Sequence, residues 1–171
     1  LNPFMKYFES KTSVTRWLTA GDKTRDAMGE RNDYFQYITG VLHDKGVNLV
    51  LGSDSGIMYA VPGISTHDEI ALLKKSGLPN EAILRAATLN AARALGVADR
   101  FGSIEEGKIA DLVLTTDNPL VDLDSLRAPS AVIKNGQWLG AEEMQQLKDS
   151  AENPSNAYLT FGRLLEFVTP W

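Results

Sequence analysis

The chain contains no cysteine among its 171 residues. This absence excludes disulfide bonds, thiolate metal ligands and a cysteine nucleophile. Histidine is also scarce, with only His43 and His67 present, although a catalytic metal site takes about three or four protein ligands and histidine is the commonest of them. The residues of this chain therefore do not assemble a convincing catalytic metal centre by themselves.

Long apolar runs and clusters of basic residues are missing too. Three polar residues, Arg85, Asn90 and Arg93, interrupt the most apolar region, so we expect no membrane span. The net charge is −5 and no run of lysine and arginine occurs. Nucleic acid is therefore not expected as a partner, because phosphate binding needs clustered cations.

The first residues, LNPFMKYF, begin with neither an initiator methionine nor the pattern of a signal peptide. We therefore expect this chain to be a piece of a longer protein. The cellular localisation stays open, because cysteine-free proteins occur on both sides of a membrane.

A helix and a strand are predicted in the first third of the chain. Residues 24–46 place apolar side chains at helical spacing and end in a glycine. The next segment, VNLVL at 47–51, is apolar on both faces, which is typical of a parallel strand covered by helices. The glycine- and proline-containing residues 52–65 are predicted to form a loop.

Three helices are predicted next. Thr66 and Glu69 fit a capping box, which places the start of the first helix at Thr66; Gly77 ends it. A second helix begins near Pro79, where a missing amide does no harm, and a third ends at Gly96.

The pattern changes to short strands after Gly102. Residues 110–116 and 130–134 are predicted strands, and Asn135-Gly136 is the dipeptide most typical of a tight hairpin. The tail from Ala141 is expected to form one or two amphipathic helices.

Asp54 is the main candidate for a functional residue. It follows the predicted strand between Gly52 and Gly56, and the carboxyl ends of parallel strands are where ligands and catalytic groups collect. The local pattern leaves two interpretations open. Asp54 is either a metal ligand or general base, or the residue of an Asx-turn that only closes the loop.

The two histidines are weaker candidates. His67 lies near the start of a predicted helix, where it is either a metal ligand or acid/base group, or serves in packing and capping. His43 lies near a helix end, where solvation and the helix dipole favour it.

Four blocks of the sequence together resemble a known family. In order they are GVNLVLGSDSG, PGISTHDEIALLKKSGLPNEAILRAATLNAARALG, FGSIEEGKIADLVLTTDNPL and AVIKNGQWL. They look like the C-terminal part of an amidohydrolase-superfamily enzyme, over about residues 33–139. Within that superfamily the match is closest to the imidazolonepropionase-like and Xaa-Pro dipeptidase (prolidase-like) branch.

The resemblance implies an α/β fold. The chain would supply the C-terminal portion of a (β/α)8 TIM-type barrel, namely its last strand and helices, plus strands of a small β-sandwich. Residues 1–101 would then end the barrel, 102–139 would form sandwich strands and 140–171 a helical tail. The segment 47–51 would be the eighth barrel strand.

The resemblance also implies a chemistry. The whole enzyme would be a metal-dependent hydrolase of carbon–nitrogen bonds in amides, cyclic amides or Xaa-Pro dipeptides. It would use one or two divalent ions, expected to be zinc, whose other ligands lie outside this chain. Asp54 would bind the metal and accept the proton of the attacking water, and His67 would bind substrate.

By itself the chain is expected to be inactive. The resemblance places missing sandwich strands at the edges of its own strands, and open strand edges favour self-association or a homo-oligomer. Two alternatives remain: a self-contained, non-enzymatic interaction module in which Asp54 serves a turn, and a deaminase of the same superfamily.

Overall fold

The computed structural model describes residues 29, 31–55 and 62–152. The start of the predicted helix 24–46, Gly56 and the tail beyond 152 lie outside the described residues. The described residues up to Gly140 belong to one compact unit, and helix α6 (Ala141–Glu152) belongs to another. None of the helices within these described ranges is long and apolar enough to cross a membrane.

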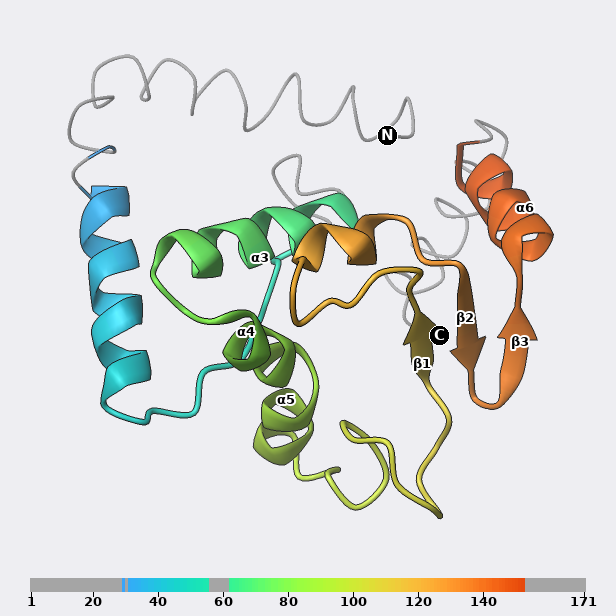
Figure 1. Cartoon of the computed structure of the whole chain (residues 1–171), viewed down its shortest axis with the longest axis horizontal. Coiled ribbons are helices and arrows are strands. Elements are labelled where there is room, and N and C mark those ends of the chain that lie inside the picture. The colour runs from blue at the N-terminus through green and yellow to red at the C-terminus, as the bar shows by residue number, and fades with distance from the viewer. Residues whose placement is uncertain (1–28, 30, 56–61, 153–171) are drawn as a thin grey trace, which may run out of the picture. The chain divides into compact units, whose positions relative to one another are not determined.

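Four helices build most of the larger unit (Figure 1). The first spans residues 31–44 and is followed by α3 (Ile64–Lys75), α4 (Asn80–Ala87) and α5 (Leu89–Ala94). The predicted stop after α3 is confirmed. Gly77 has a φ of +89°, its amide donates to the Lys74 carbonyl, and the Leu78 amide donates to the Leu73 carbonyl. These bonds satisfy carbonyls that the helix leaves unpaired.

Helix α3 begins earlier than predicted. Its N-cap is Gly63, and the amide of His67 donates to the Gly63 carbonyl at 3.4 Å. Thr66 therefore lies inside the first turn, where it has helical backbone angles and cannot act as an N-cap, which requires a non-helical conformation. The predicted capping box of Thr66 and Glu69 is wrong. The predicted start of α4 near Pro79 is confirmed, and so is the predicted stop of α5 at Gly96.

The apolar segment 47–51 is not a strand in the described structure. Its backbone bonds to helices instead: the Leu51 amide donates to the Ala86 carbonyl at 3.1 Å, and the Asn90 side chain donates to the Leu49 carbonyl at 3.0 Å. A parallel strand exists only through neighbouring strands that pair with it, and the described residues provide no such neighbour. The eighth barrel strand and the barrel are therefore not observed among the described residues.

The second half of this unit forms a small antiparallel sheet in the order β1-β2-β3. Its strands are β1 (Leu112–Leu114), β2 (Ala131–Lys134) and β3 (Gln137–Leu139). Asn135 and Gly136 join β2 to β3 with φ of +51° and +80°, the left-handed pair that a type I′ hairpin needs. The predicted hairpin is confirmed, while β1 is shorter than the predicted 110–116. A second sheet, which a sandwich requires, is not seen among the described residues.

An apolar cluster joins the helices to the chain between β1 and β2. Its buried members are Ile70, Leu73, Leu78, Ile83 and Leu123, and the partly buried Leu49, Leu51, Leu84 and Leu126 pack against them. Leu123 belongs to the short 3-10 helix η1 (Leu123–Arg127). The cluster therefore holds the apolar segment 47–51 and η1 against α3 and α4.

Truncating Ile83 is expected to destabilise the chain. Its side chain is 0% exposed at the centre of this cluster, so Ile83→Ala removes buried methyl groups and leaves a cavity. The expected loss in the free energy of unfolding is about 2–5 kcal/mol. Ile104, which is 86% exposed, provides the control, since Ile104→Ala should cost less than about 0.5 kcal/mol. Urea unfolding of both variants measures the difference, and similar losses would contradict the observed core.

The hairpin is expected to weaken at low pH. The Lys134 ammonium donates to Asp111 Oδ2, and the Asn135 amide donates to Oδ1 at 2.6 Å; these bonds lower the pKa of Asp111 below its ordinary value. As the pH falls, the unfolded chain therefore takes up this proton before the folded chain does.

The stabilisation is complete above the ordinary pKa of an aspartate and disappears as the pH falls through the lower folded value. Between about pH 6 and pH 2, the urea midpoint of the wild-type chain should fall further than that of Asp111→Asn. Asp99→Asn, at another exposed aspartate, should leave the wild-type pH dependence in place. An unchanged dependence in Asp111→Asn would contradict the role of this carboxylate.

Candidate functional site

Asp54 lies in an exposed turn that directly follows the apolar segment 47–51. Leu49 and Leu51 pack against the core and hold the start of this turn, so the aspartate emerges where a half-buried segment reaches the surface. Its φ is +48°, a left-handed conformation that is uncommon for residues other than glycine, although aspartate and asparagine tolerate it better than most.

Three serines hold this turn against helix α3, and we call them the serine chain. The hydroxyl oxygens of Ser53 and Ser55 lie 2.6 Å apart, and those of Ser55 and Ser65 lie 2.7 Å apart. Ser65 belongs to the first turn of α3. The serine chain therefore joins the residues on both sides of Asp54 to a helix that is fixed by the core.

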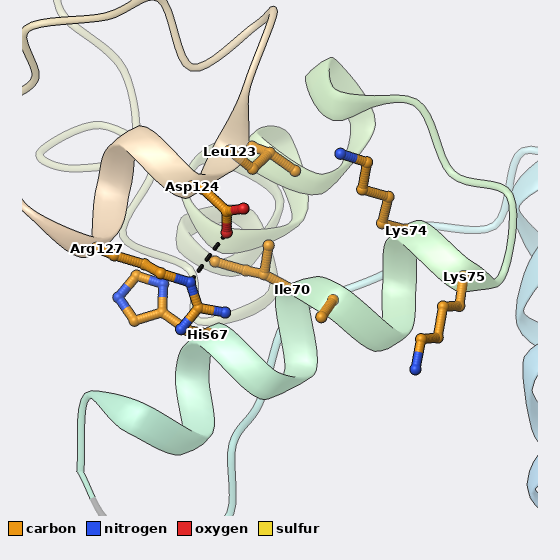
Figure 2. Close-up of a pocket in the computed structure, with 8 residues that line it drawn as sticks. His67, Ile70, Lys74, Lys75, Leu123, Asp124 and Arg127 are labelled. Carbon is orange, nitrogen blue, oxygen red and sulfur yellow. Dashed lines mark hydrogen bonds and ion pairs between the residues drawn. The ribbon is translucent and has the colours of Figure 1, made fainter.

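His67 lies elsewhere, in a cavity of about 380 Å³ between α3 and η1 (Figure 2). Arg127 and Asp124 form an ion pair at 2.9 Å across the η1 face of this cavity. The complete lining is His67, Ile70, Ala71, Lys74, Lys75, Leu123, Asp124 and Arg127. Asp54 is not part of this lining, so the two predicted site residues do not meet in this cavity.

His43 is a partly exposed residue of the first helix. Its carbonyl accepts a hydrogen bond from the Gly46 amide at 2.9 Å, which belongs to the end of that helix. It does not line the cavity of His67. Its placement agrees with the interpretation as a residue of the helix end.

The sequence did not indicate that Glu69 lines a cavity. This residue lines a second cavity of about 260 Å³ between the first helix and α3, together with polar residues that include Asn32 and Gln36. Burial raises the pKa of Glu69 above its ordinary value, because removal from water disfavours the charged carboxylate. The supposed capping box concealed this placement, since a capping residue would face the helix end.

The described residues do not provide a complete set of metal ligands. Within residues 29, 31–55 and 62–152, no three histidine, aspartate or glutamate side chains come together in a way that could hold a metal. Asp54 offers one carboxylate, whereas a catalytic zinc site takes about three protein ligands. The described residues therefore do not fit a metal centre of their own, and Asp54 can contribute only one ligand to a larger one.

Several known proteins are similar to parts of this chain. The model of the Amidohydrolase family matches residues 33–139. Imidazolonepropionase of Caldanaerobacter subterraneus subsp. tengcongensis is 40% identical over 86 residues, which cover 47% of this chain and 19% of that protein. 5-methylthioadenosine/S-adenosylhomocysteine deaminase of Syntrophobacter fumaroxidans is 32% identical over 80 residues, which cover 43% of this chain and 18% of that protein.

A solved structure is similar as well. The crystal structure of a Xaa-Pro dipeptidase with bound methionine in the active site has a TM-score of 0.55 and 29% sequence identity. The similarity covers 62% of this chain and 25% of that chain. This chain thus spans a quarter or less of the length of these three relatives.

Proposed function

Because this chain belongs to the amidohydrolase family, we propose that it is the C-terminal part of a metal-dependent hydrolase of carbon–nitrogen bonds. The family match spans residues 33–139, which contain all four of the resembling sequence blocks. The observation that carries the proposal is Asp54, an exposed carboxylate held at the end of the apolar segment 47–51 within this region. In the complete protein this segment would be the last strand of the barrel, paired with strands from outside the described residues.

Asp54 is proposed to bind the metal and to act as general base. A divalent cation, which we expect to be zinc, would be held by Asp54 together with ligands outside the described residues and would supply Lewis acidity at the reacting centre. The carboxylate of Asp54 accepts the proton of the attacking water and returns it to the leaving nitrogen, a role for which the side chain must lie within hydrogen-bond reach of the reacting atoms. Its exposure at the tip of a supported turn suits this role.

The proposed substrates are amides, cyclic amides or Xaa-Pro dipeptides. This choice follows the two relatives named imidazolonepropionase and Xaa-Pro dipeptidase. His67 remains a proposed substrate-binding residue, and its cavity would suit an anionic group because Lys74 and Lys75 also line it, while Arg127 pairs with Asp124. Deamination is the second candidate, since one relative is named a deaminase.

The test uses the longer protein that contains this chain, purified with zinc. Xaa-Pro dipeptides, cyclic amides and N-acyl amino acids are incubated with it, and the released amine is measured. We expect hydrolysis of at least one class, its loss after chelation and its return with added zinc. Release of free ammonia from a nucleobase-like ring, without amide hydrolysis, would favour the deaminase. No turnover of either kind would contradict both candidates.

This chain alone is expected to bind no stoichiometric metal. Dialysis against dilute zinc, followed by mass spectrometry of the bound metal, measures the amount in the wild-type chain and in Asp54→Ala. About one zinc per chain, lost in Asp54→Ala, would show that the segment builds a site of its own and would contradict the proposed division of ligands.

A further inference from the structure

We propose that Ser55 is a positioning residue for Asp54, acting through the serine chain of Ser53, Ser55 and Ser65. The inference rests on the proposed role of Asp54 and goes beyond it, because it identifies what holds that carboxylate in place. Ser55 is the central member, since its hydroxyl contacts both of the others.

The contact between Ser53 and Ser55 indicates a bent backbone at Asp54. Ser53 and Ser55 flank Asp54, and their hydroxyl oxygens lie 2.6 Å apart. In an extended segment, residues two positions apart are separated by about 6.6 Å between their Cα atoms, so a direct contact between short serine side chains favours a bent backbone. Asp54 stands at the apex of this bend with its φ of +48°.

The left-handed backbone of Asp54 has a free-energy cost that its surroundings must offset. A left-handed backbone is unfavourable for a residue with a Cβ atom, and such conformations persist where the surroundings impose them. The net stabilisation by a hydrogen bond is of the same order as this cost. The bond of 2.7 Å between Ser55 and Ser65 connects the bend to α3, whose Ile70 and Leu73 lie in the core.

The direction of the Asp54 carboxylate depends on the backbone of the turn. Asp54 is exposed, so side-chain packing does little to fix its direction, and the backbone of the turn sets where the carboxylate points. Loss of the Ser55 hydroxyl should release the bend and let the carboxylate leave its position. A displacement of about 1 Å costs about 10²-fold in rate at an active site, so we expect kcat to fall by about 10- to 100-fold in Ser55→Ala.

The experiment compares three variants of the longer protein in the hydrolysis assay. Ser55→Ala should lower kcat with little change in KM, Ser55→Thr should restore kcat because it restores the hydroxyl, and Ser125→Ala should behave as wild type. Ser125 is the matched control because its hydroxyl also donates a hydrogen bond, to the Asp122 carbonyl at 2.8 Å. Urea midpoints of all three should agree, since a merely structural role would lower stability and activity together.

A second readout needs no activity. In the ¹⁵N-labelled 171-residue chain, the coupling between the amide and α protons of Asp54 reports its φ. This coupling should change in Ser55→Ala and stay unchanged in Ser55→Thr. An unchanged coupling in Ser55→Ala, or a kcat equal to that of Ser125→Ala, would overturn the inference. If the wild-type protein hydrolyses nothing, the proposed function fails, and the coupling alone decides whether Ser55 positions Asp54.

Discussion

Replacing Asp54 with asparagine is expected to lower kcat of the longer protein by about 10²–10⁴-fold, the range that a positioned general base contributes. Asparagine has the same shape, and it also tolerates the left-handed backbone that Asp54 adopts with a φ of +48°. The substitution therefore removes the ability to accept a proton while preserving the turn. The measurement is the steady-state rate of the amide or dipeptide hydrolysis that the wild-type protein catalyses.

The control for this substitution is Asp68→Asn. Asp68 is another exposed aspartate of the matched region, on helix α3, and its substitution should leave kcat within about twofold of wild type, because exposed positions away from a site are nearly neutral. Urea midpoints of both variants should equal that of wild type. Full activity of Asp54→Asn would remove Asp54 from the mechanism and favour the interpretation as a turn residue.

Replacing Gly102 with alanine is expected to be strongly destabilising, although the change adds only one methyl group. A Cβ atom at Gly102 would lie 2.7 Å from the Ala92 Cβ and 2.9 Å from the Leu89 Cα, and the φ of this glycine is +91°. The loop thus lies directly against α5, and neither the helix backbone nor Cβ can move aside. The backbone strain and the overlap together should cost about 2–5 kcal/mol of unfolding free energy.

Gly107→Ala separates the two contributions. Gly107 has a similar φ of +86°, but an added Cβ there meets no atom within 4 Å. Only the backbone strain remains, so we expect a loss of about 1–2 kcal/mol. Both values come from urea unfolding. If the two variants lose equal stability, the close approach of the loop to α5 does not contribute to the fold.

Local chemistry made several elements predictable. Gly77 and Pro79 mark a helix end and a helix start, and Asn135-Gly136 forms the hairpin, because each depends on backbone angles and amides within a few residues. The start of α3 was not predictable in this way. Thr66 fits a cap, but the turn at Gly63 starts the helix before it, and a sequence pattern does not rank two neighbouring starts.

The candidate site divides in the same manner. The sequence indicates Asp54 as a candidate functional residue through its residue type, the surrounding glycines and serines, and the four blocks that identify the family. The contact between Ser55 and Ser65 links residues ten positions apart, and the burial of Glu69 depends on a helix that precedes it by many residues. Neither contact leaves a local signal.

The sequence by itself therefore determined the family, the helix limits set by Gly77 and Pro79, and the hairpin, since short-range backbone preferences and ordered motifs carry that information. Only the tertiary structure decided that His67 lines a cavity to which Asp54 does not contribute and that segment 47–51 bonds to helices. Strand pairing and cavity walls are made by residues distant in the chain, so an apolar run such as VNLVL does not specify the elements against which it packs.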